Sequence, residues 1–143
     1  MGTARICLAG RAQITNPDYK SNILEAMSDA ANRQAAEDAY YSALDLYAEG
    51  RHDDAIEQYK KAIEFDAAFT DAMHGLARAY QDLNRLDEAI EVAKKLSALD
   101  PNDILAHTSL SILYQKKGMV PEAEEEGNKA RILGWKQQLK QKE

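Results

Sequence analysis

The sequence holds little that would support catalysis or covalent cross-linking. Its 143 residues include one cysteine, Cys7, so no internal disulfide can form, and this usage fits a reducing compartment. There is no glycine-rich phosphate-binding loop and no nucleophile motif, and no base, nucleophile and oxyanion donor occur together. We therefore predict that the protein is not an enzyme and uses no cofactor or metal.

Two further absences narrow the range of partners. Lys and Arg total 18 against 24 Asp and Glu, a formal charge of -6, so the chain lacks the cationic face that nucleic-acid binders need. No apolar run approaches membrane-spanning length, and the apolar stretch at 6–9 is too short for the hydrophobic region of a secretory signal. We predict a cytoplasmic protein that binds no nucleic acid and does not insert into a membrane.

What the sequence does contain is a repeat of 34 residues. Three series of positions recur at this spacing: Gly50, Asn84 and Gly118; Ala55, Ala89 and Ala123; and Ala62, Leu96 and Ala130. A fixed period of this length indicates one supersecondary unit copied three times. A short solenoid of this kind offers a surface for partners more readily than a pocket for chemistry.

Each period contains two amphipathic stretches with apolar residues at three- and four-residue steps, which is helical spacing. The pattern predicts helices over about 34–49, 52–65, 70–83, 86–99, 104–117 and 120–133, and no strand. The series Gly50, Asn84 and Gly118 marks the breaks within the pairs, and at Gly50 and Gly118 the glycine can take the left-handed conformation that closes a helix. Pro101 ends another helix, and Asn102 or Asp103 can cap the next one.

The two flanks carry weaker patterns. We predict an N-terminal extension over 1–33, partly disordered and then helical, with residues 1–26 poorly ordered or not native to the working protein. Residues 21–33 could run straight into the first repeat helix or fold back as a separate cap. Gly134 is expected to stop the last helix, so that a short helix over about 135–142 covers the end of the array. The repeat domain then spans 34–143, with repeats at about 36–69, 70–103 and 104–135 followed by this capping tail.

The repeated residues form a recognisable pattern. The second copy has Met73, Leu76-Ala77, Tyr80, Ala89 and Pro101; the third has His107, Leu110-Ser111, Tyr114 and Ala123; and the first, which is looser, has Ala39, Ser42-Ala43, Leu46, Ala55 and Tyr59. Over about residues 34–135 this pattern resembles the tetratricopeptide repeat. The resemblance implies an all-α fold: a right-handed α-solenoid of three helix-turn-helix repeats, with the N-terminal segment and the short C-terminal capping helix flanking it. The family's junction proline is replaced by Ala67 after the first repeat and by Trp135 after the third, and Gly127 stands where the second helix usually has an aromatic residue or alanine. These departures indicate a looser last repeat.

Small residues recur where paired helices should approach closely. Ala43, Ala77 and Ser111 fall in the middle of first helices, and the series Ala55, Ala89 and Ala123 falls in the second helices. A large side chain at such a position overpacks the core. We therefore expect Ala89→Leu to lower the melting temperature.

In proteins of the family that this chain resembles, the first helices line a concave groove that takes a peptide. Carrying those positions over gives Tyr40, Tyr41, Leu44 and Tyr47 from the first repeat, His74, Arg78 and Gln81 from the second, and Thr108, Ile112 and Gln115 from the third. The tyrosines are candidate anchors, and Arg78 could hold a carboxylate or backbone carbonyl of the partner. The alternative is that residues 21–33 pack over these side chains, which would then be core.

The histidines have a structural interpretation. His52-Asp53-Asp54 could suggest a metal or acid–base site, but at a helix start Asp favours the dipole and caps free N–H groups. His74 faces the groove and His107 faces the packed side, so a shared metal is not expected and His107 is interpreted as a satisfied half-buried residue.

The leading functional prediction is a non-enzymatic adaptor or scaffold that binds a protein or peptide in its groove. A subgroup of the family binds acidic chaperone C-termini through a Lys/Asn/Arg clamp, but the matching positions are Tyr40, Leu44, Gly75, Leu105 and Ser109, which argues against that role. One alternative is a self-assembling scaffold, a homo-oligomer formed by end-to-end stacking. Trp135 and the stripe of Ile23, Leu24 and Met27 could drive such assembly. A further alternative is a small acidic chaperone of the secretion type.

Overall fold

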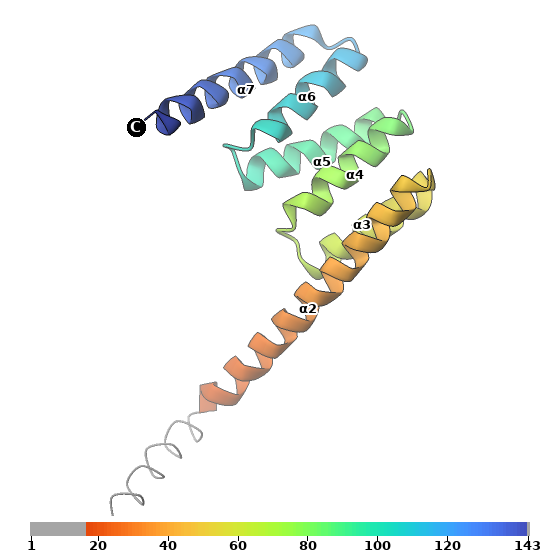
Figure 1. The fold of residues 1–143 in the computed structure, drawn as a ribbon, viewed down its shortest axis with the longest axis vertical. Coiled ribbons are helices and arrows are strands. Elements are labelled where there is room, and N and C mark those ends of the chain that lie inside the picture. Colours follow the sequence, from red (N-terminus) through yellow and green to blue (C-terminus); the bar gives the residue numbers. More distant parts are fainter. Residues whose placement is uncertain (1–16, 143) are drawn as a thin grey trace, which may run out of the picture.

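A computed structural model describes residues 17–142 of the chain, and side chains from residue 20 onward. Within that range the chain forms six α-helices and no strand: α2 (Pro17–Ala48), α3 (His52–Phe65), α4 (Thr70–Asp82), α5 (Leu86–Leu99), α6 (Ile104–Lys116) and α7 (Val120–Gln141). Consecutive helices pack as three pairs, α2 with α3, α4 with α5 and α6 with α7, and the pairs stack in sequence order (Figure 1). The predicted all-α solenoid of three helix pairs is confirmed. None of these helices has both the length and the apolar character needed to cross a membrane.

The turn inside each pair is the same structure repeated three times. Gly50, Asn84 and Gly118 have φ angles of 82°, 60° and 79°. Each is followed by a residue whose N–H donates to a carbonyl five positions earlier: Arg51 to Leu46, Arg85 to Tyr80, and Met119 to Tyr114, at 2.8–2.9 Å. This is the Schellman pattern, which closes a helix through a residue in the left-handed conformation. The 34-residue recurrence therefore reflects a backbone requirement that glycine and asparagine meet best.

The turns between pairs also repeat. Asp66 and Asp100 donate their N–H groups to the carbonyls of Ala62 and Leu96, and their side chains accept from the N–H groups two residues on, both at 3.1 Å. Asp103 then caps α6, since its Oδ1 accepts from the N–H groups of Leu105 and Ala106 at 3.0 and 3.3 Å. The predicted cap at this junction is confirmed, with Asp103 in that role.

The core is built largely from small side chains. Ala43, Ala55 and Ala89 are fully buried, and Ala123 is 2% exposed. These positions let the paired helices approach closely, and larger buried side chains such as Leu110 and Leu113 fill the space between pairs. Ser111 replaces alanine in the last pair, where its hydroxyl donates to the carbonyl of Ala123 at 2.8 Å.

At the N-terminal flank, one of the two alternatives is confirmed. Residues 21–33 run straight into the first repeat helix as part of α2 and form no separate cap, and α2 begins at Pro17. Residues 1–16, on which the rest of that prediction falls, lie outside the described part of the chain. Proline is tolerated in the first turn of a helix, and no proline or glycine interrupts residues 21–49.

At the other end, α7 runs through Gly134 to Gln141, so the capping segment is the continuation of α7 and not a separate helix. A glycine ends a helix when it adopts a positive φ. Gly134 is not among the glycines that do so, and its neighbours are helix formers.

Candidate protein-binding groove

A cavity of about 370 Å³ opens between α2 and α4, with the start of α6 at its edge. Its lining combines aromatic, aliphatic and charged side chains: Tyr40, Leu44, Tyr47, Tyr59, Asp71, His74, Gly75, Arg78 and Leu105. Apart from Tyr59, all of these residues come from the first helices of their pairs. This is the arrangement in which a mostly apolar depression with a few polar groups can seat a partner side chain.

Tyr59 reaches the groove from α3 because residue 75 has no side chain. A Cβ atom on Gly75 would lie 2.5 Å from Cε1 and Cζ of Tyr59 and 2.8 Å from its hydroxyl oxygen. The tyrosine therefore occupies the space next to the α4 backbone and is only 1% exposed. Burial raises the pKa of Tyr59 to about 12, so the hydroxyl stays protonated at neutral pH.

An aromatic cluster continues from this floor to the surface. The ring of Tyr40 lies 6.1 Å from that of Tyr59, 5.2 Å from that of Phe69 and 5.7 Å from that of Tyr41, all tilted. These are favourable distances and orientations for aromatic pairs. Tyr41 itself is 61% exposed and does not line the cavity, so it stands beside the opening with most of its ring accessible.

The charged groups of the groove differ in how they are satisfied. Tyr47 donates its hydroxyl to Asp82, and this hydrogen bond, together with burial, raises the pKa of Tyr47 while the nearby Arg78 opposes the rise. Arg78 is exposed and forms no ion pair with any carboxylate in residues 20–142. The guanidinium is therefore the cation in this cavity that is available to an incoming carboxylate or carbonyl group.

His74 is engaged within the protein. Its Nε2 lies 2.7 Å from Oδ2 of Asp103, the residue that caps α6 through its other oxygen. The pair connects α4 to the start of the next helix pair and holds the groove wall at the junction between repeats. We therefore assign His74 a structural part in the groove and not that of a free ligand group.

The ten predicted groove residues fall into two sets. Five line the cavity together: Tyr40, Leu44, Tyr47, His74 and Arg78. The other five are elsewhere along the same side of the first helices or at its edge: Tyr41, Gln81, Thr108, Ile112 and Gln115. The Thr108 hydroxyl donates to the carbonyl of Ile104 at 2.8 Å, and Gln115 borders a separate cavity between α6 and α7.

The alternative in which residues 21–33 cover the groove is wrong. In this segment Asn32 alone is half-buried and every other residue is exposed, because α2 carries the segment away from the stack (Figure 1). Residues 21–33 therefore do not bury the side chains of the groove.

The other histidines have structural roles. His107 is 7% exposed, with Nδ1 at 2.6 Å from Oε2 of Glu126 and Nε2 at 2.8 Å from the carbonyl of Pro101, as the sequence interpretation expected. Burial raises the pKa of Glu126, but hydrogen bonds from His107 and Lys129 outweigh it and leave this pKa below its ordinary value. No group of three His, Cys, Asp or Glu side chains in the described residues is arranged to hold a metal ion.

The His52-Asp53-Asp54 prediction needs a partial correction. Both aspartates lie in the first turn of α3, where they favour the dipole, but the cap position forms no side-chain hydrogen bond. Asp54 instead accepts from Nε of Arg51 at 2.9 Å. The ring of His52 packs at 4.9 Å from that of Tyr47, and its Nδ1 is buried without a partner in the described residues, so the histidine contributes packing.

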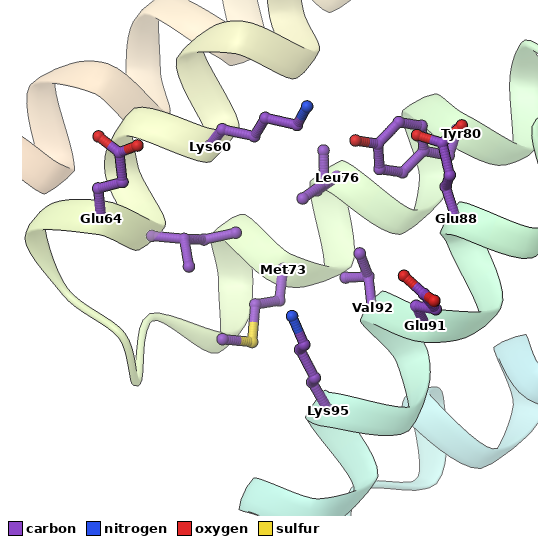
Figure 2. Close-up of a pocket in the computed structure, with 10 residues that line it drawn as sticks. Lys60, Glu64, Met73, Leu76, Tyr80, Glu88, Glu91, Val92 and Lys95 are labelled. Atoms are coloured by element: carbon purple, nitrogen blue, oxygen red, sulfur yellow. The ribbon is translucent and has the colours of Figure 1, made fainter.

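A second cavity, of about 320 Å³, was not anticipated from the sequence. It lies between α3, α4 and α5, with Ile63, Met73, Leu76 and Val92 forming an apolar floor. Figure 2 shows Lys60 and Lys95 extending across it, with Glu64, Glu88 and Glu91 at the rim. Tyr80 closes one side, with the Arg85 guanidinium 4.9 Å from the centre of its ring. Charges of both signs surround this floor, so its chemistry favours no one class of ligand.

Comparison with known proteins gives a consistent result. The family model of the tetratricopeptide repeat matches residues 46–113. No curated protein matches the sequence. Among solved structures, MamA is similar with 27% identity and a TM-score of 0.70, covering 72% of this chain and 60% of the MamA chain. This chain thus spans less than two thirds of the length of that neighbour.

Two other solved structures are similar in fold. The second TPR of Spaghetti (RPAP3), bound to the HSP90 peptide SRMEEVD, has 23% identity and a TM-score of 0.68, covering 72% of this chain and 95% of its own. The Yersinia enterocolitica type III secretion translocator chaperone SycD has 22% identity and a TM-score of 0.66, covering 70% and 76% of the two chains. At these identities the likeness concerns the fold.

Proposed function

Because the chain is a tetratricopeptide-repeat protein, we propose that it is a non-enzymatic interaction module that binds a protein or peptide partner in the groove between α2 and α4. The observation that carries this proposal is the cavity of about 370 Å³, which joins an aromatic floor to Arg78, a cation that pairs with no carboxylate among residues 20–142. A neighbour of the same fold is bound to a peptide, which supports the use of such a surface for recognition.

The lining suggests how a partner is held. An apolar side chain of the partner fits against Leu44 and Leu105, which are 38% and 64% exposed, and burial of their apolar area supplies most of the affinity. Arg78 then donates hydrogen bonds to a carboxylate or main-chain carbonyl of the partner and fixes its orientation. The exposed ring of Tyr41 adds contact area beside the opening at low entropic cost.

The cytoplasm suits such a module, since the single Cys7 leaves no internal pair to oxidise. The resemblance to SycD concerns the fold, so it does not support the narrower role of a secretion chaperone, and no residue that lines the groove favours that role. Nor does the groove present the clamp for acidic chaperone termini, since Leu44 and Leu105 are aliphatic and position 75 carries no side chain.

An affinity capture from native extract with the full chain tests the proposal. The comparison is between the wild type, a Tyr41→Ala/Arg78→Ala variant and a matched control, Arg131→Ala, which removes an exposed arginine from α7. We expect one partner to be retained by the wild type and the control and lost by the groove variant, with all three equally helical. A partner held equally by all three proteins would refute binding through this groove.

A further inference from the structure

The groove between α2 and α4 carries opposite charges at its two ends. Asp71 and Arg78 both line the cavity, and both belong to α4, seven positions apart. Seven positions are nearly two full turns of a helix, so the two side chains lie on the same side of α4 with their backbones separated by about 10 Å. The cavity therefore has an acidic end near the start of α4 and a basic end further along it.

Neither charge is neutralised by the described part of the protein. Asp71 and Arg78 are both exposed, and neither takes part in an ion pair among residues 20–142. Asp71 lies in the first turn of α4, where it favours the helix dipole without using its oxygens in a cap. The carboxylate of Asp82 accepts the hydroxyl of Tyr47 and does not line the cavity. Both ends can therefore interact with charged groups of a partner.

The acidic end combines its carboxylate with aromatic rings. Burial raises the pKa of the Tyr40 hydroxyl, and the charge of Asp71 nearby raises it further. The rings of Tyr41 and Phe69 lie 5.7 and 5.2 Å from that of Tyr40. Glu37 is exposed at the equivalent position of the preceding repeat, 34 residues before Asp71. Carboxylates beside aromatic faces attract a cation through its charge and through cation–π contact.

The rest of the cavity separates the two ends and makes them selective. Leu44 of α2 and Leu105 of α6 provide aliphatic contacts on either side of α4. Among the residues that line the cavity, Arg78 is the one lysine or arginine and Asp71 the one carboxylate. A partner with its charges in the opposite order would place like charges together at both ends, which disfavours that orientation.

We propose that the groove recognises a segment that presents a basic and an acidic side chain about 10 Å apart with an aliphatic side chain between them, the basic group at Asp71 and the acidic group at Arg78. This separation corresponds to about three residues of an extended segment or seven of a helix. The inference rests on the proposed binding in the groove, and it adds the charge pattern of the partner and its orientation along α4.

Selection from a phage-displayed library of random twelve-residue peptides, with the full chain as bait, tests the pattern. The wild type is compared with Asp71→Asn, with Arg78→Gln and with the control Glu124→Gln/Arg131→Gln, which removes two exposed charges seven positions apart on α7, outside this cavity. We expect the wild type and the control to enrich peptides that carry Lys or Arg and Asp or Glu at one of these spacings around an aliphatic residue. Asp71→Asn should lose the preference for the basic residue alone, and Arg78→Gln that for the acidic residue alone.

Fluorescence polarisation with a peptide selected by the wild type then measures the affinities, with circular dichroism to verify that all variants are equally helical. Each single variant should bind this peptide about tenfold or more weakly than the wild type and the control do. Selected peptides that lose binding to a Tyr41→Ala variant but show no charge pattern, or a pattern that neither single variant changes, would overturn this inference and leave binding in the groove standing. If no peptide were enriched, or if the enriched peptides bound every variant equally, the proposed function would be refuted together with it.

Discussion

The contact between Gly75 and Tyr59 makes a quantitative prediction about both stability and the groove. In a Gly75→Ala variant the new Cβ would lie 2.5 Å from two ring atoms of Tyr59, whereas carbon atoms pack best at about 3.5–4.0 Å, so the ring must withdraw by roughly 1 Å. Tyr59 is 1% exposed and has little room to do so. Overpacking of this kind costs about 1–3 kcal/mol.

The helix propensity of alanine acts in the opposite direction. Replacing a mid-helix glycine with alanine gains about 1 kcal/mol, so the net loss expected for Gly75→Ala is about 0–2 kcal/mol. Gly134→Ala supplies the matched control, because Gly134 is also within a helix and its Cβ would meet nothing within 4 Å. The control should gain about 1 kcal/mol, and the difference between the two variants should equal the overpacking cost.

Urea unfolding of the wild type and both variants, followed by circular dichroism, measures these free energies. A double-mutant cycle with Tyr59→Leu then assigns the cost to the tyrosine, because the alanine at position 75 should become tolerable once the ring is gone. If Gly75→Ala were as stabilising as Gly134→Ala, the ring would not be held against the α4 backbone, and the account of the groove floor would be refuted.

Two further predictions concern the core and its response to acid. Ala89→Leu places a large side chain at a fully buried position, so it should destabilise the protein by about 1–3 kcal/mol in thermal melts, and an unchanged melting curve would contradict the assigned helix register. Burial raises the folded-state pKa of Glu126, but hydrogen bonds from His107 and Lys129 outweigh burial and lower this pKa below its ordinary value. The ionised carboxylate therefore contributes its full stabilisation above the ordinary pKa, and this stabilisation is lost as the pH falls from there through the lowered pKa. Unfolding free energies measured down this acidic range should therefore fall less steeply for Glu126→Gln than for the wild type, and parallel curves would exclude the predicted linkage.

The fold could be predicted from the sequence at positions where a recurring residue type meets a requirement of the backbone conformation. Gly50, Asn84 and Gly118 recur because each must adopt a positive φ, so their spacing located the three turns and the helix pairs between them. Gly134 shows the limit of this reasoning. The residue type is the same, but the stop requires the left-handed conformation, and the chain does not adopt it there. Composition alone does not distinguish the two cases.

The extent of α2 was similarly open to two interpretations. Residues 21–33 are apolar at helical spacing, which fits a helix that packs back on the repeats as well as one that continues into them. The absence of proline and glycine up to Glu49 favours continuation, since no residue is suited to the tight turn that a cap would need. The structure has the continuous helix, with residues 21–33 running into the first repeat helix as part of α2.

The candidate groove was predicted in part, because the family resemblance places first helices along it. Half of the predicted residues line the cavity, but Tyr59 was missed since it belongs to a second helix, where aromatic residues are expected in the core. The available signal was the glycine at position 75, in the middle of a helix where glycine is costly. Read together with a large aromatic in the preceding helix, it indicates a close approach between helices.

The shape of the groove therefore depends on residues that a helical pattern does not identify as functional. Gly75 sets the depth of the groove, because the absence of a side chain there leaves room for the ring of Tyr59. Asp103, at the junction between helix pairs, positions the groove wall: one carboxylate oxygen caps α6 and the other contacts His74. Because both carboxylate oxygens are engaged, a shift of the cap would displace His74, and a displaced His74 would change the wall that a partner meets. The same carboxylate thus contacts both the cap of α6 and a side chain of the groove wall, so we expect substitutions of Asp103, at a junction outside the groove, to alter recognition within it.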